Sequence, residues 1–341
     1  GRSLHCRLFQ VSSRMSTTAE GAAVPAATAN GQGASVSDKY SEAMKEKMGS
    51  TLTYRHEDGM NYARVTPRLI VGSCPQLPED VDRLHGGEGV GVIFCLQEDK
   101  DMEHFGLDVA PIRRRAAELG IAHVREPVRD FDPFDLRRRL PVAVGRLARE
   151  LAARPEGQAA YVHCTAGLGR APGTALAYMF WMDGACLDEA YGRLFEVRRC
   201  HPQLGMVRAA TCDLIAGGEG GLCHTEIRIA RKGASVVEVA GLDVGWGKRL
   251  RLEKDANGGF VLSRQLPAGS YQYKFIVDGE WLANPDSPTV DNNGNVNNVA
   301  TVVPPPGSAD AERRERIMAP GGRPTAEELA LIREALLAGP S

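Results

Sequence analysis

The chain has 341 residues, a formal charge of −2 at pH 7 and eight cysteines. This length allows two domains with additional tails, and the near balance of charge gives no reason to expect nucleic acid as a partner. The cysteines form no Cys-x-x-Cys pair, which argues against structural zinc and against a disulfide-stapled secreted domain. The longest apolar run, around 175–182, is too short to span a bilayer, so no membrane partner is expected either.

The beginning of the chain has the composition of a tail. Three arginines stand among Ser, Thr and Ala in roughly the first 35 residues, and Glu20 is the only acidic residue before Asp38. This composition is typical of an organelle transit peptide, plastid or mitochondrial, and a merely disordered tail is the alternative. We therefore expect residues 1–48 to be a transit peptide or a disordered segment.

From residue 49 the pattern becomes that of a packed domain, which we expect to extend to residue 218. Short β-branched runs bounded by turn residues alternate with segments that have helical spacing. Strands are expected at 68–73, 91–96, 121–128 and 159–163, with helices at 78–84, 109–119, 136–151, 170–182, 187–199 and 204–216. Strands that alternate with helices imply an α/β sheet covered on both faces.

The most informative stretch of this domain is a glycine-bearing loop between a strand and a helix that opens at Arg170. Its sequence is His163-Cys164-Thr165-Ala166-Gly167-Leu168-Gly169-Arg170. Such a loop aims successive backbone N–H groups, and the positive end of a helix dipole, at one point, which makes an anion site. The same amides, the dipole and Arg170 favour the thiolate form of Cys164.

A buried structural thiol in an ordinary turn is the alternative interpretation of Cys164. The complete string His-Cys-(five residues)-Arg favours catalysis, because a nucleophilic sulfur inside a phosphate cradle implies phosphoryl transfer to cysteine. Arg170 adds a planar fork that matches phosphate oxygens. The string resembles the signature of the protein tyrosine and dual-specificity phosphatases, and residues 164–170 resemble the narrower group of glucan phosphatases. The resemblance implies the α/β fold of a dual-specificity phosphatase domain.

A cysteine phosphatase also needs a proton donor for its leaving group. An acidic loop ahead of the cysteine holds three candidates, Asp130, Asp132 and Asp135, and spacing alone does not choose among them. We expect Asp135 to be the N-cap of the following helix, and Asp132 suits a turn. Asp130 matches the general acid of the family by its place in Arg-Asp-Phe-Asp, so the resemblance implies that role for it.

The reaction expected from this set begins with attack of the Cys164 thiolate on phosphorus, while the loop amides and Arg170 hold the oxygens. Asp130 then protonates the departing alcohol and later deprotonates the water that hydrolyses the phosphocysteine. We expect His163 to order the loop and support the thiolate, and we expect neither a metal nor another cofactor. Many phosphatases of this kind carry Ser or Thr where this chain has Ala171, a difference that concerns the speed of intermediate breakdown.

After a glycine-rich linker at 217–221 the pattern changes to short alternating strands separated by turns. Their regular spacing predicts a small all-β sandwich, which we expect at 222–303. This part resembles a family 48 carbohydrate-binding module, and the β subunits of AMP-activated kinases carry a similar domain. The resemblance rests on four separate stretches, 241–247, 271–275, 278–281 and 297–298.

Two tryptophans of this module, Trp246 and Trp281, lie beside glycines, where a flat aromatic face can stack on a glucose ring. Lys274 and Asn298 can form hydrogen bonds with the sugar hydroxyls. The alternative is that both tryptophans are core residues, but the four matched stretches favour sugar binding. Trp181, inside an apolar helix, is expected in the core.

The last segment, 304–341, contains an amphipathic helix at 325–337. Thr325 is its expected N-cap, and Glu328 completes a capping box. The apolar stripe of this helix must be buried somewhere. The resemblance to glucan phosphatases implies that the segment packs back on the phosphatase domain.

The order of phosphatase, carbohydrate module and tail resembles that of the plant phosphoglucan phosphatases. The resemblance implies that the substrate is phosphate esterified to glucose units of starch, that its removal supports starch degradation, and that the protein acts in the plastid (chloroplast). It also implies that Phe131 and Phe105 line a glucan channel.

Cys95, near the end of a neighbouring strand, is a candidate to form a disulfide with Cys164 on oxidation. A plastid thiol-redox regulator would then be a partner of the protein. The alternative is that Cys95 is a plain core thiol.

Two rival classes of function stay open. One is a dual-specificity protein phosphatase that the module merely tethers to starch. The other is a scaffold whose module serves a kinase complex. The set of Cys164, Arg170 and Asp130 weighs against the scaffold, but it does not separate the two enzymes.

Overall fold

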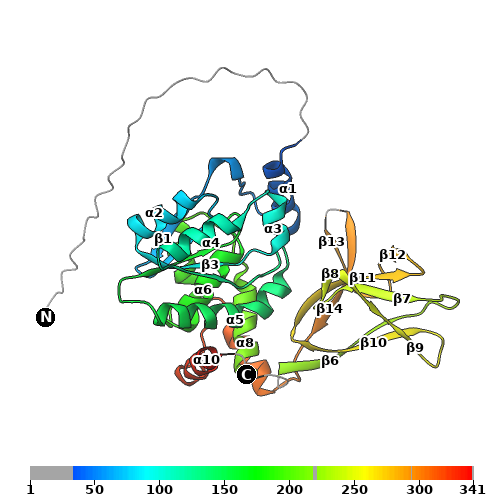
Figure 1. Cartoon of the computed structure of the whole chain (residues 1–341). Helices are drawn as coiled ribbons and strands as arrows, with labels where there is room; N and C mark the ends of the chain where they lie inside the picture. The colour runs from blue at the N-terminus through cyan, green and yellow to red at the C-terminus, as the bar shows by residue number, and fades with distance from the viewer. Residues whose placement is uncertain (1–33, 218–220, 293, 340–341) are drawn as a thin grey trace. The chain divides into compact units, whose positions relative to one another are not determined.

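The computed structural model describes residues 34–217, 221–292 and 294–339 (Figure 1). The expected transit peptide falls mainly on residues 1–33, which lie outside the described residues. The expectation that the disordered tail extends to residue 48 is wrong for residues 36–48. These residues form the helix α1 (Val36–Met48), in which Tyr40 and Met44 are buried. Their spacing of four residues gives this helix one apolar face, and that face packs on the following domain.

The first domain is built on a five-stranded sheet in the order β1-β2-β5-β3-β4. β1 runs antiparallel to β2, and the other neighbours are parallel. The strands are β1 (Tyr62–Thr66), β2 (Leu69–Gly72), β3 (Val90–Cys95), β4 (Ala122–Arg125) and β5 (Ala159–His163). The central strand, β5, leads directly into the cysteine loop, so this loop lies at the carboxyl end of the sheet, where α/β folds bind ligands.

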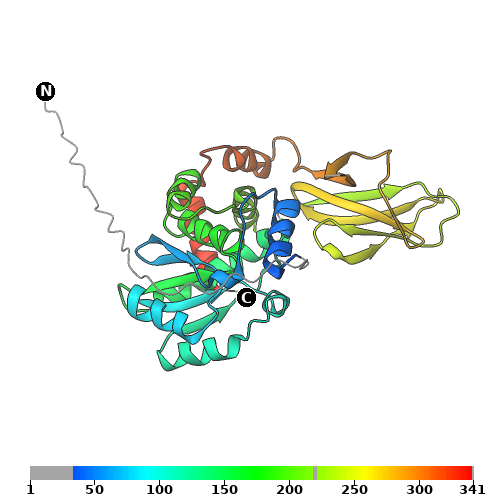
Figure 2. The same ribbon diagram turned by 90° about the horizontal axis from the view of Figure 1, so that it is seen from above.

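Helices cover both faces of this sheet, as Figure 2 shows from above. They are α2 (Pro78–Glu88), α3 (Asp99–His104), α4 (Val109–Glu118), α5 (Pro133–Ala152), α6 (Arg170–Trp181), α7 (Leu187–Val197) and α8 (Leu204–Ala216), preceded by the short 3-10 helix η1 (His56–Asp58). Along β5, Ala160 and Val162 pack with α5, α6, α7 and α8. Ala159 and Tyr161 point to the opposite face and pack with α2 and α4. The predicted α/β class is confirmed, and Trp181 is fully buried as expected.

The second domain is the predicted all-β sandwich. One sheet has the order β6-β10-β9 and the other the order β13-β14-β11-β7-β8, with β12 paired to β11. The strands are β6 (Leu222–Ile229), β7 (Val237–Gly241), β8 (Gly245–Arg251), β9 (Glu253–Lys254), β10 (Phe260–Pro267), β11 (Gly269–Val277), β12 (Glu280–Leu282), β13 (Thr289–Asn292) and β14 (Asn295–Val302). Tyr271, Tyr273 and Phe275 of β11 enter the core between the sheets, so the alternate residue Lys274 belongs to the outer face.

Two helices follow the sandwich, α9 (Ala309–Met318) and α10 (Ala326–Ala338). α10 begins with the predicted capping box, in which the Glu328 amide donates to Thr325 Oγ1 and the Thr325 amide donates to Glu328 Oε2. Ile332 and Leu336 of α10 are buried in the core that α5 and α6 also form. Across the described ranges, no helix combines the length and the apolar character needed to cross a membrane.

Side chains of α5 and α9 contact the sandwich directly. The rings of Phe134 and Tyr271 are stacked, with centroids 4.6 Å apart and an interplanar angle of 13°. Asp213 of α8 accepts hydrogen bonds from Arg137 at 2.6 and 2.7 Å and from Arg314 at 2.8 Å. The Asp213 carboxylate thus joins α5, α8 and α9, and Arg314 also donates to the Ala268 carbonyl at 3.5 Å, just before β11.

Candidate active site

The cysteine loop is held in place from two sides. Gly167 has a φ of +67°, and a Cβ at this position would overlap the backbone carbonyl of Gly72. Only glycine therefore lets the loop approach β2 this closely. On the other side, Arg198 donates hydrogen bonds to the carbonyls of Gly167 at 2.8 Å and Ala166 at 2.9 Å. Since N–H and C=O of a trans peptide point in opposite directions, these bonds direct the following amides away from Arg198.

Cys164 begins the loop, and its side chain is 2% exposed. Its backbone carbonyl accepts a hydrogen bond of 3.1 Å from Nδ1 of His163. Burial lowers the pKa of His163 to about 3, so the imidazole is neutral at physiological pH and Nδ1 carries its proton. This hydrogen bond agrees with the expectation that His163 orders the loop. Because the imidazole is neutral, His163 does not act there as a positive charge.

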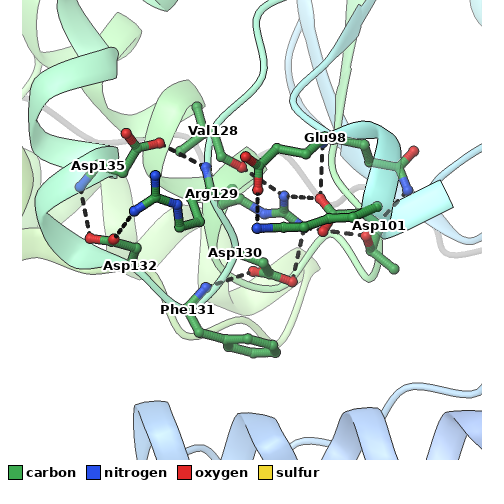
Figure 3. Close-up of polar contacts among 12 residues, drawn as sticks. Glu98, Asp101, Val128, Arg129, Asp130, Phe131, Asp132 and Asp135 are labelled. Atoms are coloured by element: carbon green, nitrogen blue, oxygen red, sulfur yellow. Dashed lines mark hydrogen bonds and ion pairs between the residues drawn. The ribbon is translucent and has the colours of Figure 1, made fainter. Parts of the chain in front are cut away.

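Arg170 is the first residue of α6, and its guanidinium is buried. Nη1 donates to Asp101 Oδ2 at 2.5 Å and to the Val128 carbonyl at 2.9 Å. Nη2 lies 2.9 Å from Asp130 Oδ2 and donates to Thr165 Oγ1 at 3.2 Å. Asp101, Val128 and Asp130, which Figure 3 labels, thus all contact this one group. These contacts fix the orientation of the Arg170 guanidinium, whose planar fork can then bind phosphate oxygens.

Asp130 connects the acidic loop to the cysteine loop. Its Oδ2 accepts a hydrogen bond of 2.6 Å from the Tyr40 hydroxyl, in addition to the pair with Arg170. Burial and the neighbouring Asp130 raise the pKa of Tyr40 well above its ordinary value, so the phenol is the donor in this bond. Phe131, the next residue, has a φ of 59°, a left-handed conformation that is rare for a bulky residue and that occurs preferentially at functional sites.

The other two aspartates of this loop have structural positions. Asp132 is the N-cap of α5 and accepts hydrogen bonds from two amides of its first turn. The prediction that Asp135 is the N-cap is wrong, because Pro133 starts the helix three residues after Asp130 and needs no hydrogen bond for its nitrogen there. Asp135 lies inside the first turn and accepts the Arg129 amide at 2.8 Å (Figure 3). The structure thus separates the three candidates that spacing left equal, and it pairs Asp130 with the loop arginine.

A small cavity of about 10 Å³ adjoins Cys164, which is room for one water molecule. It is lined by residues of α1, the acidic loop and the cysteine loop: Tyr40, Met44, Met48, Ser50, Asp130, Phe131, Cys164, Ala166, Leu168, Gly169 and His201. The nucleophile and the acid of the expected reaction therefore border the same cavity.

An aromatic cluster, formed by Tyr40, Tyr54, Phe105 and Phe131, lies beside this cavity. The Tyr40 ring centroid is 5.5 Å from that of Phe105 and 5.4 Å from that of Phe131. Tyr54 completes the cluster at 5.8 Å from both Tyr40 and Phe105. The two aromatic residues expected to line a glucan channel are thus brought together at the site. Sequence reasoning missed the two tyrosines, because their local patterns carry no reference to the cysteine loop.

Asp101 and Arg198 were also missed. Asp101 lies 69 positions before Arg170, and its only local signal is its place in the capping box of α3, which indicates a structural role. Arg198 follows the last turn of α7, where a basic residue needs no special explanation. Both act on the cysteine loop across distances in the chain that no local motif spans.

On the sandwich, the two predicted sugar-binding tryptophans are surface residues. Trp246 is 48% exposed and Trp281 is 46% exposed, so neither belongs to the core. The Arg249 guanidinium lies over the Trp281 ring, 5.7 Å from its centroid. Lys274, on the outer face of β11, donates to Asn295 Oδ1 at 2.8 Å. Exposed aromatic faces beside polar side chains suit the stacking and hydrogen bonding of a sugar ring.

The prediction that Asn298 contacts a sugar is wrong. Its side chain is fully buried, accepts the Asn284 amide at 2.8 Å and donates to the Asn284 carbonyl at 2.8 Å. The register places Asn298 opposite Tyr273, whose ring is in the core. Because side chains alternate along a strand, the neighbouring Asn297 lies on the face of Lys274, where it is also buried and donates to Gln272 Oε1 at 3.0 Å.

Two further thiols flank the cysteine loop. Cys95 ends β3 as the strand partner of His163, and burial raises its pKa to about 11. Cys74 donates its backbone amide to the Thr165 carbonyl at 2.9 Å, and burial raises its pKa to about 12. Both side chains are therefore protonated thiols near neutral pH.

Comparisons with known proteins agree with this arrangement of two domains. Residues 62–213 match the phosphatase domain described as "Swiss Army Knife protein, DSP-PTPase phosphatase domain", and residues 224–308 match the "glycogen recognition site of AMP-activated protein kinase". The chain is 45% identical over 288 residues to phosphoglucan phosphatase DSP4, amyloplastic, of Castanea sativa, a match that covers 82% of this chain and 75% of the relative.

Two other relatives match in different extents. Phosphoglucan phosphatase LSF1, chloroplastic, of Arabidopsis thaliana is 31% identical over 273 residues, which is 78% of this chain and 45% of that protein. The 5'-AMP-activated protein kinase subunit beta-2 of Homo sapiens is 38% identical over 72 residues, 21% of this chain and 26% of the subunit. The matches to the two phosphatases are long enough to include both domains, whereas the match to the kinase subunit is about as long as the sandwich.

Proposed function

This chain belongs to the phosphoglucan phosphatase family, and on that premise we propose that it removes phosphate monoesters from glucose units of starch and so supports starch degradation. It is a cysteine-dependent phosphatase by family and fold. The observation that carries the proposal is the pairing of Asp130 with Arg170 at the cavity that Cys164 borders. Catalysis is assigned to the domain at 49–218 and glucan binding to the module at 222–303, while the segment at 304–341 packs on helices of the first domain.

The proposed reaction has two steps. In the first, the Cys164 sulfur forms a bond to phosphorus as the bond to the sugar oxygen breaks, and Asp130 gives its proton to that oxygen. In the second, Asp130 takes a proton from a water molecule, and the water oxygen forms a bond to phosphorus. The sulfur–phosphorus bond breaks, which releases phosphate and restores the Cys164 thiolate. Arg170 and the loop amides hold the phosphoryl oxygens through both steps. His163 positions Cys164 through its backbone carbonyl.

The proposed glucan contacts come from both domains. Phe105 and Phe131 offer aromatic faces beside the cavity, and Trp246 and Trp281 offer exposed faces on the sandwich. Lys274 supplies a donor on the outer face of β11. A polymer substrate can contact both sets, whereas a short phosphopeptide has no sugar ring for either.

We place the protein in the plastid. The two phosphatase relatives are named amyloplastic and chloroplastic, and the transit peptide expected from composition would lie in residues 1–33.

We also propose a redox partner for this site. Peroxide oxidises the Cys164 thiolate to a sulfenic acid, and the Cys95 thiol then attacks that sulfur, forming a disulfide and releasing water. A plastid dithiol protein restores both thiols by disulfide exchange. The strand pairing of Cys95 with His163 supports this choice, and Cys74 is the competing thiol. Mass spectrometry of the peroxide-treated protein tests it: a Cys95–Cys164 peptide is expected, and a Cys74–Cys164 peptide would reassign the partner.

The function is tested by phosphate release from phosphorylated amylopectin and from a phosphotyrosine peptide. Wild type should prefer the glucan, Trp246→Ala should remove that preference without changing peptide hydrolysis, and Cys164→Ser should abolish both activities. If the peptide is preferred and Trp246→Ala changes nothing, the module is only a tether and the chain is a protein phosphatase.

A further inference from the structure

One face of α1 covers the active site. Tyr40, Met44 and Met48, each four residues apart, all line the cavity beside Cys164. Met44 packs in one cluster with Ala166 of the cysteine loop. The cavity of about 10 Å³ that remains accommodates one water molecule and has no room for a phosphate group. In this state the helix separates the cysteine loop from any bulky substrate.

Tyr40 takes the position that a substrate needs. Its ring contacts Phe105 and Phe131, the two residues proposed to line the glucan channel, at 5.5 and 5.4 Å between centroids. Its hydroxyl donates to Asp130 Oδ2 at 2.6 Å, where the leaving-group oxygen of the substrate would meet the proposed acid. The Tyr40 ring therefore occupies the space proposed for the sugar ring, and its hydroxyl occupies the place proposed for the ester oxygen.

Polar side chains of α1 also contact the domain, and Lys47 Nζ lies 5.2 Å from the centroid of the Phe131 ring. Ser37 Oγ donates to Glu57 Oε2 at 2.6 Å, and Ser41 Oγ accepts the Tyr54 amide at 3.0 Å. A helix of 13 residues is marginal by itself in water, so its place depends on these bonds and on the apolar face. Gly49 follows the helix with a φ of +64°, and no atom lies within 4 Å of its Cβ position, so the chain can act as a hinge at that point.

From this geometry we infer that α1 is an intramolecular competitor of the glucan: Tyr40 fills the substrate position while the helix is seated, and the glucan must displace it. The inference rests on the proposed function, since it takes Phe105 and Phe131 as glucan contacts and Asp130 as the acid. It predicts that the full-length protein exists in a closed state, as seen here, and an open state that binds substrate. Weakening the seat of α1 should therefore activate the enzyme.

The test compares full-length Tyr40→Phe and Tyr40→Ala with Tyr62→Phe, a matched control whose hydroxyl faces Glu88 away from the site. Each is measured with p-nitrophenyl phosphate and with phosphorylated amylopectin. Tyr40→Ala should raise kcat/KM about tenfold on both substrates, since it removes a buried hydrogen bond and the ring contacts. Tyr40→Phe should give a smaller rise, and the control none.

The opposite result has a clear meaning. A lower kcat for Tyr40→Phe at unchanged KM would overturn the inference and make Tyr40 a positioning residue for Asp130. Activation with p-nitrophenyl phosphate, without any hydrolysis of amylopectin by any variant, would support the covering role of α1 while overturning the proposed function.

A second measurement does not depend on how the Tyr40 variants fold. Hydrogen exchange of the α1 amides is followed in full-length Cys164→Ser, with and without phosphorylated maltodextrin. Displacement predicts faster exchange of Val36–Met48 when the glucan is bound. Unchanged or slower exchange would show that α1 stays seated with the substrate and would overturn the inference.

Discussion

The Asp101 carboxylate lies 2.5 Å from the Arg170 guanidinium, and the two side chains are 9% and 4% exposed. This pair joins the first turn of α3 to the first residue of α6. A long arginine side chain has many rotamers, so a phosphate-binding arginine must lose them either before or during binding. Asp101 and the Val128 carbonyl fix Arg170 in advance, which removes that cost from the reaction.

Replacing Asp101 tests this preorganisation. We expect Asp101→Asn to lower kcat by about 10- to 100-fold, because a hydrogen bond to a charged group contributes about 1.5–3 kcal/mol. Asp101→Glu should restore part of the loss. Asp99→Asn on the same helix is the control, since the Asp99 side chain is 77% exposed and pairs with Arg125. Steady-state kinetics with an aryl phosphate gives the answer, and an unchanged kcat for Asp101→Asn would remove Asp101 from the positioning of Arg170.

Gly167 offers a test of the loop geometry. Gly167→Ala should reduce activity by at least about tenfold and lower the melting temperature, because the new methyl group must push the loop away from Gly72. Gly120→Ala is the matched control: its φ of +70° resembles the +67° of Gly167, but no atom lies within 4 Å of its Cβ position. The control should therefore show only the cost of a left-handed alanine, about 1 kcal/mol. Equal effects of the two substitutions would contradict a steric role for Gly167.

Two residues of the sandwich should separate stability from sugar binding. Asn298→Ala removes both side-chain bonds to Asn284 and should destabilise the module by about 2–4 kcal/mol without changing the glucan affinity of the folded protein. Lys274→Ala should do the reverse, with weaker glucan binding and an unchanged melting temperature. Calorimetric titration with maltoheptaose and thermal unfolding of both variants provide the comparison. Loss of affinity in folded Asn298→Ala would restore it as a sugar ligand.

The buried His163 predicts a dependence of stability on pH. Its pKa is about 3 in the folded protein against an ordinary value of about 6.5, so between these values the unfolded state binds more protons. The contribution of His163 to stability is therefore complete above pH 6.5 and declines as the pH falls, by about 2 kcal/mol between pH 7 and pH 5. Urea denaturation at both pH values should show that His163→Asn has a smaller decline than wild type. His85→Asn, at an exposed position, should match wild type.

The sequence by itself identified Cys164 as the proposed nucleophile, because the pattern that indicates it is local. The string from His163 to Arg170 contains the strand end, the glycine turn and the helix start, and all three follow from residues within eight positions. The same holds for the capping box at Thr325 and for the alternation of β11 that buries Tyr271 and exposes the face of Lys274. Periodicity and short motifs report such relationships directly, since neighbours in the chain are neighbours in space.

The tertiary structure decided every relationship that crosses the fold. Asp130 and Asp132 are two residues apart and alike in chemistry, yet only packing shows that one meets Arg170 and the other caps α5. Likewise, Asn297 and Asn298 are adjacent and both buried, yet the first side chain bonds Gln272 and the second bonds the Asn284 backbone. Tyr40 reaches Asp130 across 90 positions, from a segment whose composition resembles a tail. A helix with so weak an intrinsic pattern forms there because the cysteine loop supplies the apolar surface it covers, and that surface exists only after the chain has folded.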